Sequence, residues 1–358
     1  MEQGSLFDGE QHMKRKRILG LGLVLALVLG GCGQVSDEYI QQAMTKIGQL
    51  HYEGALETLA QAEKNGEDPQ LISRGKGIAY MGMTDYENAA VHLEQALTYS
   101  DAWPDQMDYD INYYLATAYY RGGQIEKALR VYEAIIALRP QENTAWYLKG
   151  VLELEKGLVK QAQESFEKAV GIAKTDYDQL VNIYTNCSRL GHEEMGQKYL
   201  QAVLADETVK LDDFNLGRIS YYLGDYEQAR LSLENAREKG SSKAAVLLGQ
   251  TYEKLGDYNY AASVYSNYLE NREPDASIYN QLGLCKMLIG DHASALKAFR
   301  DGIAMEDNTV MQSLKFNEIV ACEKLSAFDE ARILMEQYLK TYPDDTVAQR
   351  EYDFLKTR

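Results

Sequence analysis

The sequence predicts an all-α protein built from repeated pairs of antiparallel helices, and three observations carry that prediction. A small residue returns along the chain with gaps of 34, 39, 34, 34, 33, 32, 34 and 36 residues. A bulky apolar residue follows each small residue by four positions, which places both on one face of a helix. A glycine precedes six of the small residues by five positions, where a left-handed residue ends a helix. A period of this length indicates stacked helical units rather than one closed core.

The residues of this pattern define each predicted unit as a helix, a tight turn and a second helix. The small residues are Ala55, Ala89, Ala128, Ala162, Gly196, Ala229, Ala261, Ala295 and Ala331. The bulky residues are Leu59, Leu93, Tyr132, Phe166, Leu200, Leu233, Tyr265, Phe299 and Met335. The turn glycines are Gly123, Gly157, Gly191, Gly224, Gly256 and Gly290. A small residue is expected where the two helices of a unit approach most closely.

Nine units follow one another over residues 36–345. They start near Ser36, Gln70, Tyr109, Asn143, Tyr177, Lys210, Ser242, Ala276 and Gln312. Proline inside a helix costs about 3 kcal/mol, and all five prolines fall between units: Pro69, Pro104, Pro140, Pro274 and Pro343. Residues 346–358 read as a capping helix, with Val347, Tyr352 and Leu355 expected to cover the open apolar end of the ninth unit.

The units resemble tetratricopeptide repeats, whose pattern is Trp-x2-Leu-Gly-x2-Tyr, then Ala-x3-Phe, then Pro. The third unit supplies Leu115, Ala116, Tyr119, Ala128, Tyr132 and Pro140 in register. The fourth supplies Trp146, Gly150, Ala162, Phe166 and Ala169, and the seventh supplies Leu248, Gly249, Tyr252, Ala261 and Tyr265. The resemblance implies a right-handed superhelical solenoid in which the first helices of successive pairs line a concave groove. Sel1-like and pentatricopeptide repeats are rival families with similar periods.

The fifth and ninth units depart from this pattern. Gly196 replaces the usual alanine, and Tyr184 and Ile319 stand where glycine or alanine is expected in the first helix. Large residues at a close approach would push two helices apart. These two helix pairs are therefore expected to be tilted or spread.

The N-terminus carries an export signal. Four basic residues, 14–17, precede an apolar run of 14 residues from Ile18 to Gly31, which is short of the roughly 20 needed to span a bilayer. The sequence Leu29-Gly30-Gly31-Cys32 resembles the lipobox of bacterial lipoproteins, which implies cleavage before Cys32 and lipidation of its sulfur. The alternative is an uncleaved membrane anchor. Residues 1–12 fit neither reading, and a start at Met13 would place the basic stretch at the N-terminus.

The charge of the chain indicates which classes of partner to expect, and its cysteines indicate whether disulfides form. The chain has 37 Lys and Arg against 54 Asp and Glu, and no basic stripe that would neutralise a phosphate backbone, so nucleic acid is not the expected ligand. An acidic chain favours neutral or basic partners. Three cysteines follow the signal, Cys187, Cys285 and Cys322; buried free thiols are the preferred reading, and a disulfide between the last two is the alternative.

The sequence contains no recognisable catalytic, metal or cofactor motif. The five histidines lack metal-ligand spacing, and the glycines recur with the repeat rather than in a phosphate-binding loop. An insertion at residues 99–110 contains Trp103, which is expected to cap the edge of the second unit. Its aspartates could alternatively form a calcium site, although the glycine and terminal glutamate of a calcium loop are missing.

The remaining candidate is a binding surface on the first helices of the third to sixth units. Aromatic and arginine side chains dominate interface energetics, and they recur at the positions that the resemblance assigns to the groove. The predicted groove residues are Tyr113, Tyr120, Arg121, Tyr147, Leu154, Arg189, Phe214, Arg218, Tyr221 and Tyr222. About half of them are expected to be core residues instead.

These features together predict a non-enzymatic, lipid-anchored scaffold that binds a protein or peptide at the extracytoplasmic face of a bacterial membrane. The alternatives are an assembly factor for envelope machinery, such as outer-membrane insertion or pilus biogenesis, and a carbohydrate- or cell-wall-binding module.

Overall fold

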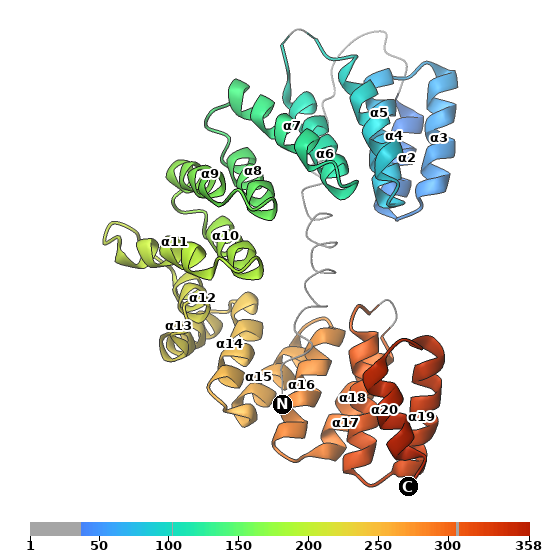
Figure 1. Ribbon diagram of the computed structural model, residues 1–358, viewed down its shortest axis with the longest axis vertical. Coiled ribbons are helices and arrows are strands. Elements are labelled where there is room, and N and C mark those ends of the chain that lie inside the picture. The colour runs from blue at the N-terminus through green and yellow to red at the C-terminus, as the bar shows by residue number, and fades with distance from the viewer. Residues whose placement is uncertain (1–36, 102, 306–307) are drawn as a thin grey trace. The chain divides into compact units, whose positions relative to one another are not determined.

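The structure is a computed structural model that describes residues 37–101, 103–305 and 308–358. Within these residues all regular structure is helical, in nineteen helices (Figure 1). They fall into two compact units divided between Val209 and Lys210. The predicted lipidation site, Cys32, and the rest of the export signal lie outside the described residues.

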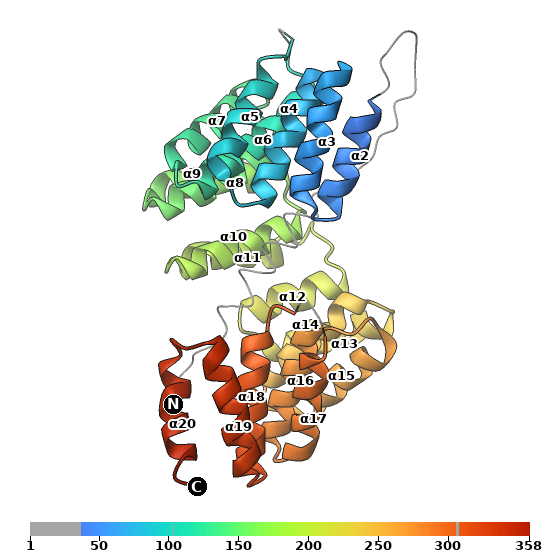
Figure 2. The same cartoon turned by 90° about the vertical axis from the view of Figure 1, so that its right-hand side faces the viewer.

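The N-terminal unit contains five helix pairs. Their helices are α2 (Glu38–Gly48) and α3 (Tyr52–Asn65), α4 (Pro69–Gly82) and α5 (Tyr86–Leu97), α6 (Gln106–Arg121) and α7 (Ile125–Leu138), α8 (Asn143–Glu155) and α9 (Val159–Ile172), and α10 (Tyr177–Arg189) and α11 (Glu193–Ala205). Figure 2 shows α2, α3 and α4 lying side by side at the start of this unit.

The C-terminal unit contains four further pairs and a final helix. These helices are α12 (Asp213–Tyr222) and α13 (Tyr226–Glu238), α14 (Ser242–Lys254) and α15 (Tyr258–Asn271), α16 (Ala276–Leu288) and α17 (His292–Ile303), α18 (Met311–Lys324) and α19 (Phe328–Thr341), and α20 (Thr346–Leu355). The predicted fold of about nine helix-turn-helix repeats followed by a capping helix is confirmed, with each pair within a few residues of its predicted start.

The helix ends follow from local sequence. The six predicted turn glycines all have φ between 75° and 83°, as a left-handed helix stop requires. The first, second and ninth pairs lack this glycine, and Leu50, Thr84 and Ser326 take the same place with φ of 62°, 62° and 61°. Pro69 is the first residue of α4 rather than lying between units, a position where its missing N–H costs nothing.

Each pair is held together by the close approach that the small residues permit. In the seventh pair, Ala261 and Tyr265 of α15 are fully buried, and the Tyr265 ring lies against Gly249 of α14. A Cβ atom on Gly249 would lie 2.3 Å from that ring, so no larger residue fits. Burying an aromatic side chain of this size contributes roughly 2–3 kcal/mol.

The fifth pair is not spread, contrary to the expectation from its unusual residues. A Cβ atom on Gly196 of α11 would lie 2.7 Å from the Cα atom of Tyr184 in α10. The close approach is therefore kept, but the glycine that permits it lies on the second helix instead of the first. The Tyr184 side chain reaches the first turn of α11, where its hydroxyl donates a hydrogen bond to Glu193 Oε1 at 3.0 Å.

The capping helix α20 covers the end of the ninth pair with Ala348 and Leu355, which are 0% and 1% exposed. Tyr352 is half-buried and donates a hydrogen bond to Glu336 Oε1 at 2.8 Å. Val347 was predicted to join them and is 58% exposed. The apolar face of α20 therefore begins one residue later than the pattern suggested.

The three cysteines in the described residues are buried free thiols. Burial raises the pKa of Cys187 and of Cys285 to about 12, and that of Cys322 to about 11. The preferred reading of these residues as small core positions agrees with this geometry. In the part of the chain that the structure describes, no helix is both long and apolar enough to cross a membrane.

Candidate functional site

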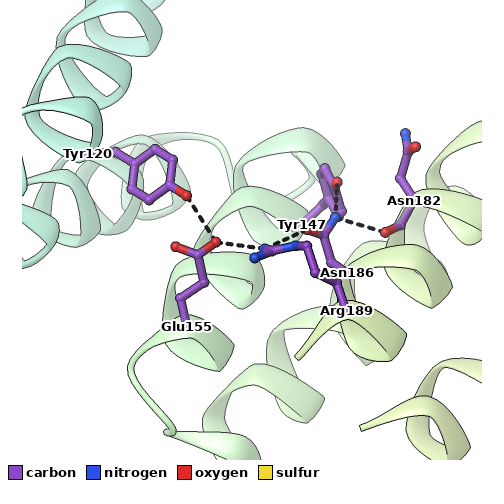
Figure 3. A network of polar contacts seen from close by, with 6 residues as sticks. All are labelled: Tyr120, Tyr147, Glu155, Asn182, Asn186 and Arg189. Carbon is purple, nitrogen blue, oxygen red and sulfur yellow. Dashed lines mark hydrogen bonds and ion pairs between the residues drawn. The ribbon is translucent and has the colours of Figure 1, made fainter. Parts of the chain in front are cut away.

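A polar network of the N-terminal unit lies on the face formed by its first helices α6, α8 and α10, hereafter the first-helix face. Tyr120, Glu155 and Arg189 come from the last turn of each of these helices and meet there (Figure 3). Three consecutive helix pairs thus contribute one side chain each to a single network.

Glu155 is the centre of this network. Its Oε1 atom accepts a hydrogen bond from the Tyr120 hydroxyl at 2.9 Å and another from Arg189 Nη2 at 2.7 Å. The Arg189 and Glu155 side chains are 26% and 15% exposed, so their ion pair is shielded from much of the solvent. A hydrogen bond to a charged group in such surroundings contributes about 1.5–3 kcal/mol.

A second arm of the network runs along α10 and back to α8. Arg189 Nη2 also donates to Asn186 Oδ1 at 3.2 Å, and Asn186 Nδ2 donates to the hydroxyl oxygen of Tyr147 at 3.2 Å and to the carbonyl of Asn182 at 2.9 Å. These contacts fix the orientation of the Asn186 amide. Figure 3 shows that the side chain of Asn182 points away from the network.

The two tyrosines of the network stay neutral at physiological pH. Burial, together with the hydrogen bond to Glu155 and the charge of its carboxylate, raises the pKa of Tyr120 to about 12. Burial likewise raises the pKa of Tyr147 to about 12. Both hydroxyls therefore serve as hydrogen-bonding groups, and neither is prepared for acid-base chemistry.

Further polar contacts join the other first helices of this unit. Arg74 Nε of α4 donates to Asp110 Oδ2 of α6 at 2.7 Å, and Asn143 of α8 donates to Gln179 of α10 at 3.2 Å. The arginines Arg74 and Arg189 thus each have a carboxylate partner. The first-helix face presents phenols, amides and neutralised ion pairs, which suits recognition by hydrogen bonding and stacking.

The other predicted groove residues of this unit differ in position. Tyr113 is half-buried and packs against Tyr132, with ring centroids 6.2 Å apart, so it belongs largely to the core. Arg121 is exposed, and its guanidinium lies 5.8 Å from the Tyr120 ring centroid. Leu154 was wrongly assigned to the groove, since it is 3% exposed and lies in the core cluster around Phe166.

In the C-terminal unit the predicted residues lie together on α12. The Arg218 guanidinium lies 5.2 Å from the Phe214 ring centroid and donates to Asn215 Oδ1 at 3.0 Å. Tyr221 contacts Tyr222 edge-on, with centroids 5.4 Å apart, and its ring also meets that of Tyr226 at 5.7 Å. All four side chains are half-buried, which leaves their role as contact residues a prediction.

The insertion between α5 and α6 is explained by local structure. Asp105 and Asp108 form a capping box at the start of α6, Asp108 also accepts from Gln70 at 2.8 Å, and Asp110 pairs with Arg74. Within the described residues no cluster of three or more His, Cys, Asp or Glu side chains could hold a metal ion. Trp103 is not a cap, because it is 88% exposed.

Sequence reasoning missed Glu155, Asn182 and Asn186. The signal for Glu155 was present, because Arg121, Glu155 and Arg189 are spaced by 34 residues and occupy one repeat position in three successive first helices. A carboxylate between two arginines at equivalent positions predicts a pair across neighbouring helices. Glu155 is neither aromatic nor an arginine, so the composition typical of an interface does not mark it.

Comparison with known proteins agrees with this architecture. The sequence matches the tetratricopeptide repeat family over residues 74–129, 113–177, 214–276 and 246–309, which together cover more than half of the chain. The protein belongs to the tetratricopeptide repeat family. No curated protein matches the sequence significantly.

Solved structures of similar fold include other proteins of this family. A tetratricopeptide repeat protein from Parabacteroides merdae ATCC 43184 is 15% identical, with a TM-score of 0.45, over 69% of this chain and 97% of that one. The type IV pilus biogenesis factor PilW is 21% identical, with a TM-score of 0.42, over 59% and 99%. A human IFIT1 dimer with PPP-AAAA is 15% identical, with a TM-score of 0.42, over 91% of both chains. At these identities the likeness concerns the helical fold alone.

Proposed function

We propose that this tetratricopeptide repeat protein is a non-enzymatic scaffold that binds an extended segment of a protein partner on the first-helix face of its N-terminal unit. The observation that carries the proposal is the network of Tyr120, Glu155 and Arg189, which spans three successive first helices. Side chains held in place before binding lose less conformational entropy when a partner arrives. A face organised in this way suits binding better than a face of free, flexible side chains.

The chemistry of this face favours a peptide backbone over a highly charged ligand. Arg189 is neutralised by Glu155 and Arg74 by Asp110, so these groups offer little net charge to a phosphate chain. The phenols Tyr120 and Tyr147 and the Asn182 amide can stack on, or exchange hydrogen bonds with, an extended main chain. We expect partner binding to weaken by no more than about threefold between 50 and 300 mM salt, because most charges of this face are paired within the chain and Arg121 adds one exposed cation.

Site-specific photo-crosslinking tests this proposal. Benzoylphenylalanine in place of Asn182 on α10 should capture one partner protein, whereas the same group in place of Gln163, which is exposed on the second helix α9, should not. Equal capture at both positions would contradict the first-helix face as the binding surface. Capture of glycan without protein would favour the carbohydrate-binding alternative.

A pair of substitutions in the network separates binding from folding. Arg189→Gln with Glu155→Gln removes both charges and keeps a polar amide at each position, and it should reduce capture at position 182 at least tenfold. Because the ion pair is partly exposed, the melting temperature should fall by only a few degrees. A large loss of stability with unchanged capture would assign the network a purely structural role.

We further propose that Cys32 carries the lipid that anchors the protein at the extracytoplasmic face of a bacterial membrane. The proposal rests on the basic stretch, the short apolar run and the sequence Leu29-Gly30-Gly31-Cys32. Stable attachment takes more than one acyl chain, which lipoprotein processing at cysteine provides. Cys32→Ser should leave an uncleaved, unlipidated chain, as measured by intact mass and detergent-phase partitioning. A wild-type chain that retains residues 14–31 without lipid would rule the anchor out.

A further inference from the structure

Three junctions between successive second helices carry chemically active side chains at equivalent repeat positions. One residue of each junction lies five positions after the small residue of its second helix. The other lies one position before the small residue of the following second helix. The three pairs are Glu94 and Lys127, Arg300 and Glu330, and Glu234 and Tyr260. The third pair differs from the others because it has no charge on the second side.

The first two junctions are closed by charges of the chain itself. Lys127 Nζ lies 4.9 Å from the centroid of the Tyr119 ring, and the Tyr119 hydroxyl donates a hydrogen bond to Glu94. At the second junction Arg300 pairs with Glu330 at 2.6 Å and with Glu318 at 2.7 Å. A cation and carboxylates thus neutralise each other at the second junction, and at the first Lys127 and Glu94 both contact the same tyrosine.

The third junction, in the C-terminal unit, is an open pocket. Tyr252 of α14 repeats the role of Tyr119, since its hydroxyl donates to Glu234 of α13. Tyr260 stands where Lys127 stands in the N-terminal unit, and its ring stacks on Tyr252 with centroids 5.3 Å apart and planes 17° apart. The pocket measures about 430 Å³ and is completed by Glu227, Arg230, Leu255 and Asp257.

This pocket has the features of a site for a cation. Two carboxylates, Glu227 and Glu234, share one internal cation, Arg230, whose Nε and Nη1 atoms lie 3.1 Å from Glu227 and Glu234 respectively. The Glu227 side chain is 68% exposed and the Tyr260 residue 61% exposed, so a carboxylate and the face of an aromatic ring are both open to solvent. An ammonium or guanidinium group is attracted to an aromatic face and to a neighbouring carboxylate at the same time.

We propose that the pocket between α13, α14 and α15 binds a lysine or arginine side chain of a protein partner. The bound side chain lies against the exposed face of Tyr260 and pairs with Glu227, as Lys127 lies over Tyr119 within the chain itself. The excess of negative charge disfavours phosphate groups and carboxylates. The site is separate from the first-helix face of the N-terminal unit, so its test does not depend on the function proposed above.

The proposal is tested by NMR titration of the purified full-length protein with acetyl-arginine amide and acetyl-lysine amide. Acetyl-norleucine amide, which lacks the charge, is the control ligand. The ring resonances of tyrosine-labelled protein report binding, and Tyr260→Phe identifies the Tyr260 signal by its loss. We expect saturable shifts at Tyr260 with the two cationic ligands alone. No shift at Tyr260, or equal shifts with the norleucine ligand, would overturn the proposal.

Two variants sharpen the test. Tyr260→Lys places a lysine of the chain itself in the pocket, as Lys127 does at the first junction, and should reduce binding of the cationic ligands at least tenfold. Because Tyr260 is mostly exposed, the melting temperature should be unchanged. Glu227→Gln should weaken binding at least threefold, whereas Glu87→Gln at the equivalent position of the second pair should have no effect. Unchanged binding by the Tyr260→Lys protein, or equal effects of the two glutamate substitutions, would contradict the pocket as the site.

Discussion

The fifth and seventh helix pairs reach the same close packing with the glycine on opposite helices. In the seventh pair Gly249 lies on the first helix and receives the ring of Tyr265 from the second. In the fifth pair Tyr184 occupies the position of Gly249, and Gly196 on the second helix lies against the backbone of α10. In these two pairs a residue without a side chain stands at the contact, and it can lie on either helix.

The largest effect is expected from adding a methyl group at the contact of the fifth pair. Gly196→Ala places a Cβ atom 2.7 Å from the Cα of Tyr184, and backbone cannot move aside as a flexible side chain can. The variant should lose about 3 kcal/mol of unfolding free energy in urea. Combining it with Tyr184→Gly, which restores the arrangement of the seventh pair, should cost less than the sum of the two single changes. Strict additivity would mean that the two positions do not compensate each other.

Pairs that keep the ordinary alanine should be less sensitive, but still overpacked by a large residue. Ala162→Leu in the fourth pair and Ala229→Leu in the sixth pair insert a side chain at fully buried positions. Each is expected to cost about 2 kcal/mol, measured by chemical unfolding. Ala134→Leu, at an exposed position of α7, is the control and should be close to neutral. If Ala162→Leu left the free energy of unfolding unchanged, the two helices of the fourth pair would not be closely packed at this position.

The turns offer a stabilising change. Thr84 holds φ at 62° where six other pairs have glycine, and a β-branched residue is strained in that region. Thr84→Gly should therefore stabilise the protein by about 1 kcal/mol, which thermal unfolding would detect. Thr84→Ala keeps a Cβ atom at the same φ and should gain less. If both substitutions stabilised the protein equally, the strain at position 84 would come from the threonine side chain and not from the positive φ of a residue with a Cβ atom.

The smallest effect concerns the ninth pair and depends on pH. Burial, with the Glu351 carboxylate nearby, raises the pKa of Glu323 to about 7. Because this folded-state pKa lies above the ordinary value of 4.5, the stabilisation from the protonated form is complete below pH 4.5 and is lost as the pH rises through 7. Glu323→Gln should be more stable than wild type at pH 8 by about 0.5 kcal/mol after solvent screening, and equal to it at pH 4.5. The same difference at both pH values would exclude titration of Glu323 as the cause.

The sequence predicts this fold well because each unit repeats its own local signals. Turn glycines such as Gly256 and small residues such as Ala261 act within one helix pair, so a single chain displays the rule several times over. Contacts between pairs are harder to predict. Glu155 is recognised only when side chains from three units are compared, and Leu154 faces the core although it is adjacent to Glu155 in sequence. Trp103 was misplaced because a loop without a period gives no register.

Aspartates that cap helices account for much of the negative charge of the chain. Ten described helices begin at an aspartate whose side chain accepts backbone N–H groups of the first turn. These aspartates are Asp68, Asp85, Asp105, Asp176, Asp212, Asp225, Asp257, Asp275, Asp291 and Asp345. Removing ten carboxylates from a formal net charge of −17 would leave −7. A large part of the net charge is thus needed to start helices, and a low isoelectric point in a repeat protein of this kind is poor evidence for a basic partner. Such evidence has to come from carboxylates that accept no helix-capping hydrogen bond, such as Glu227 and Glu234.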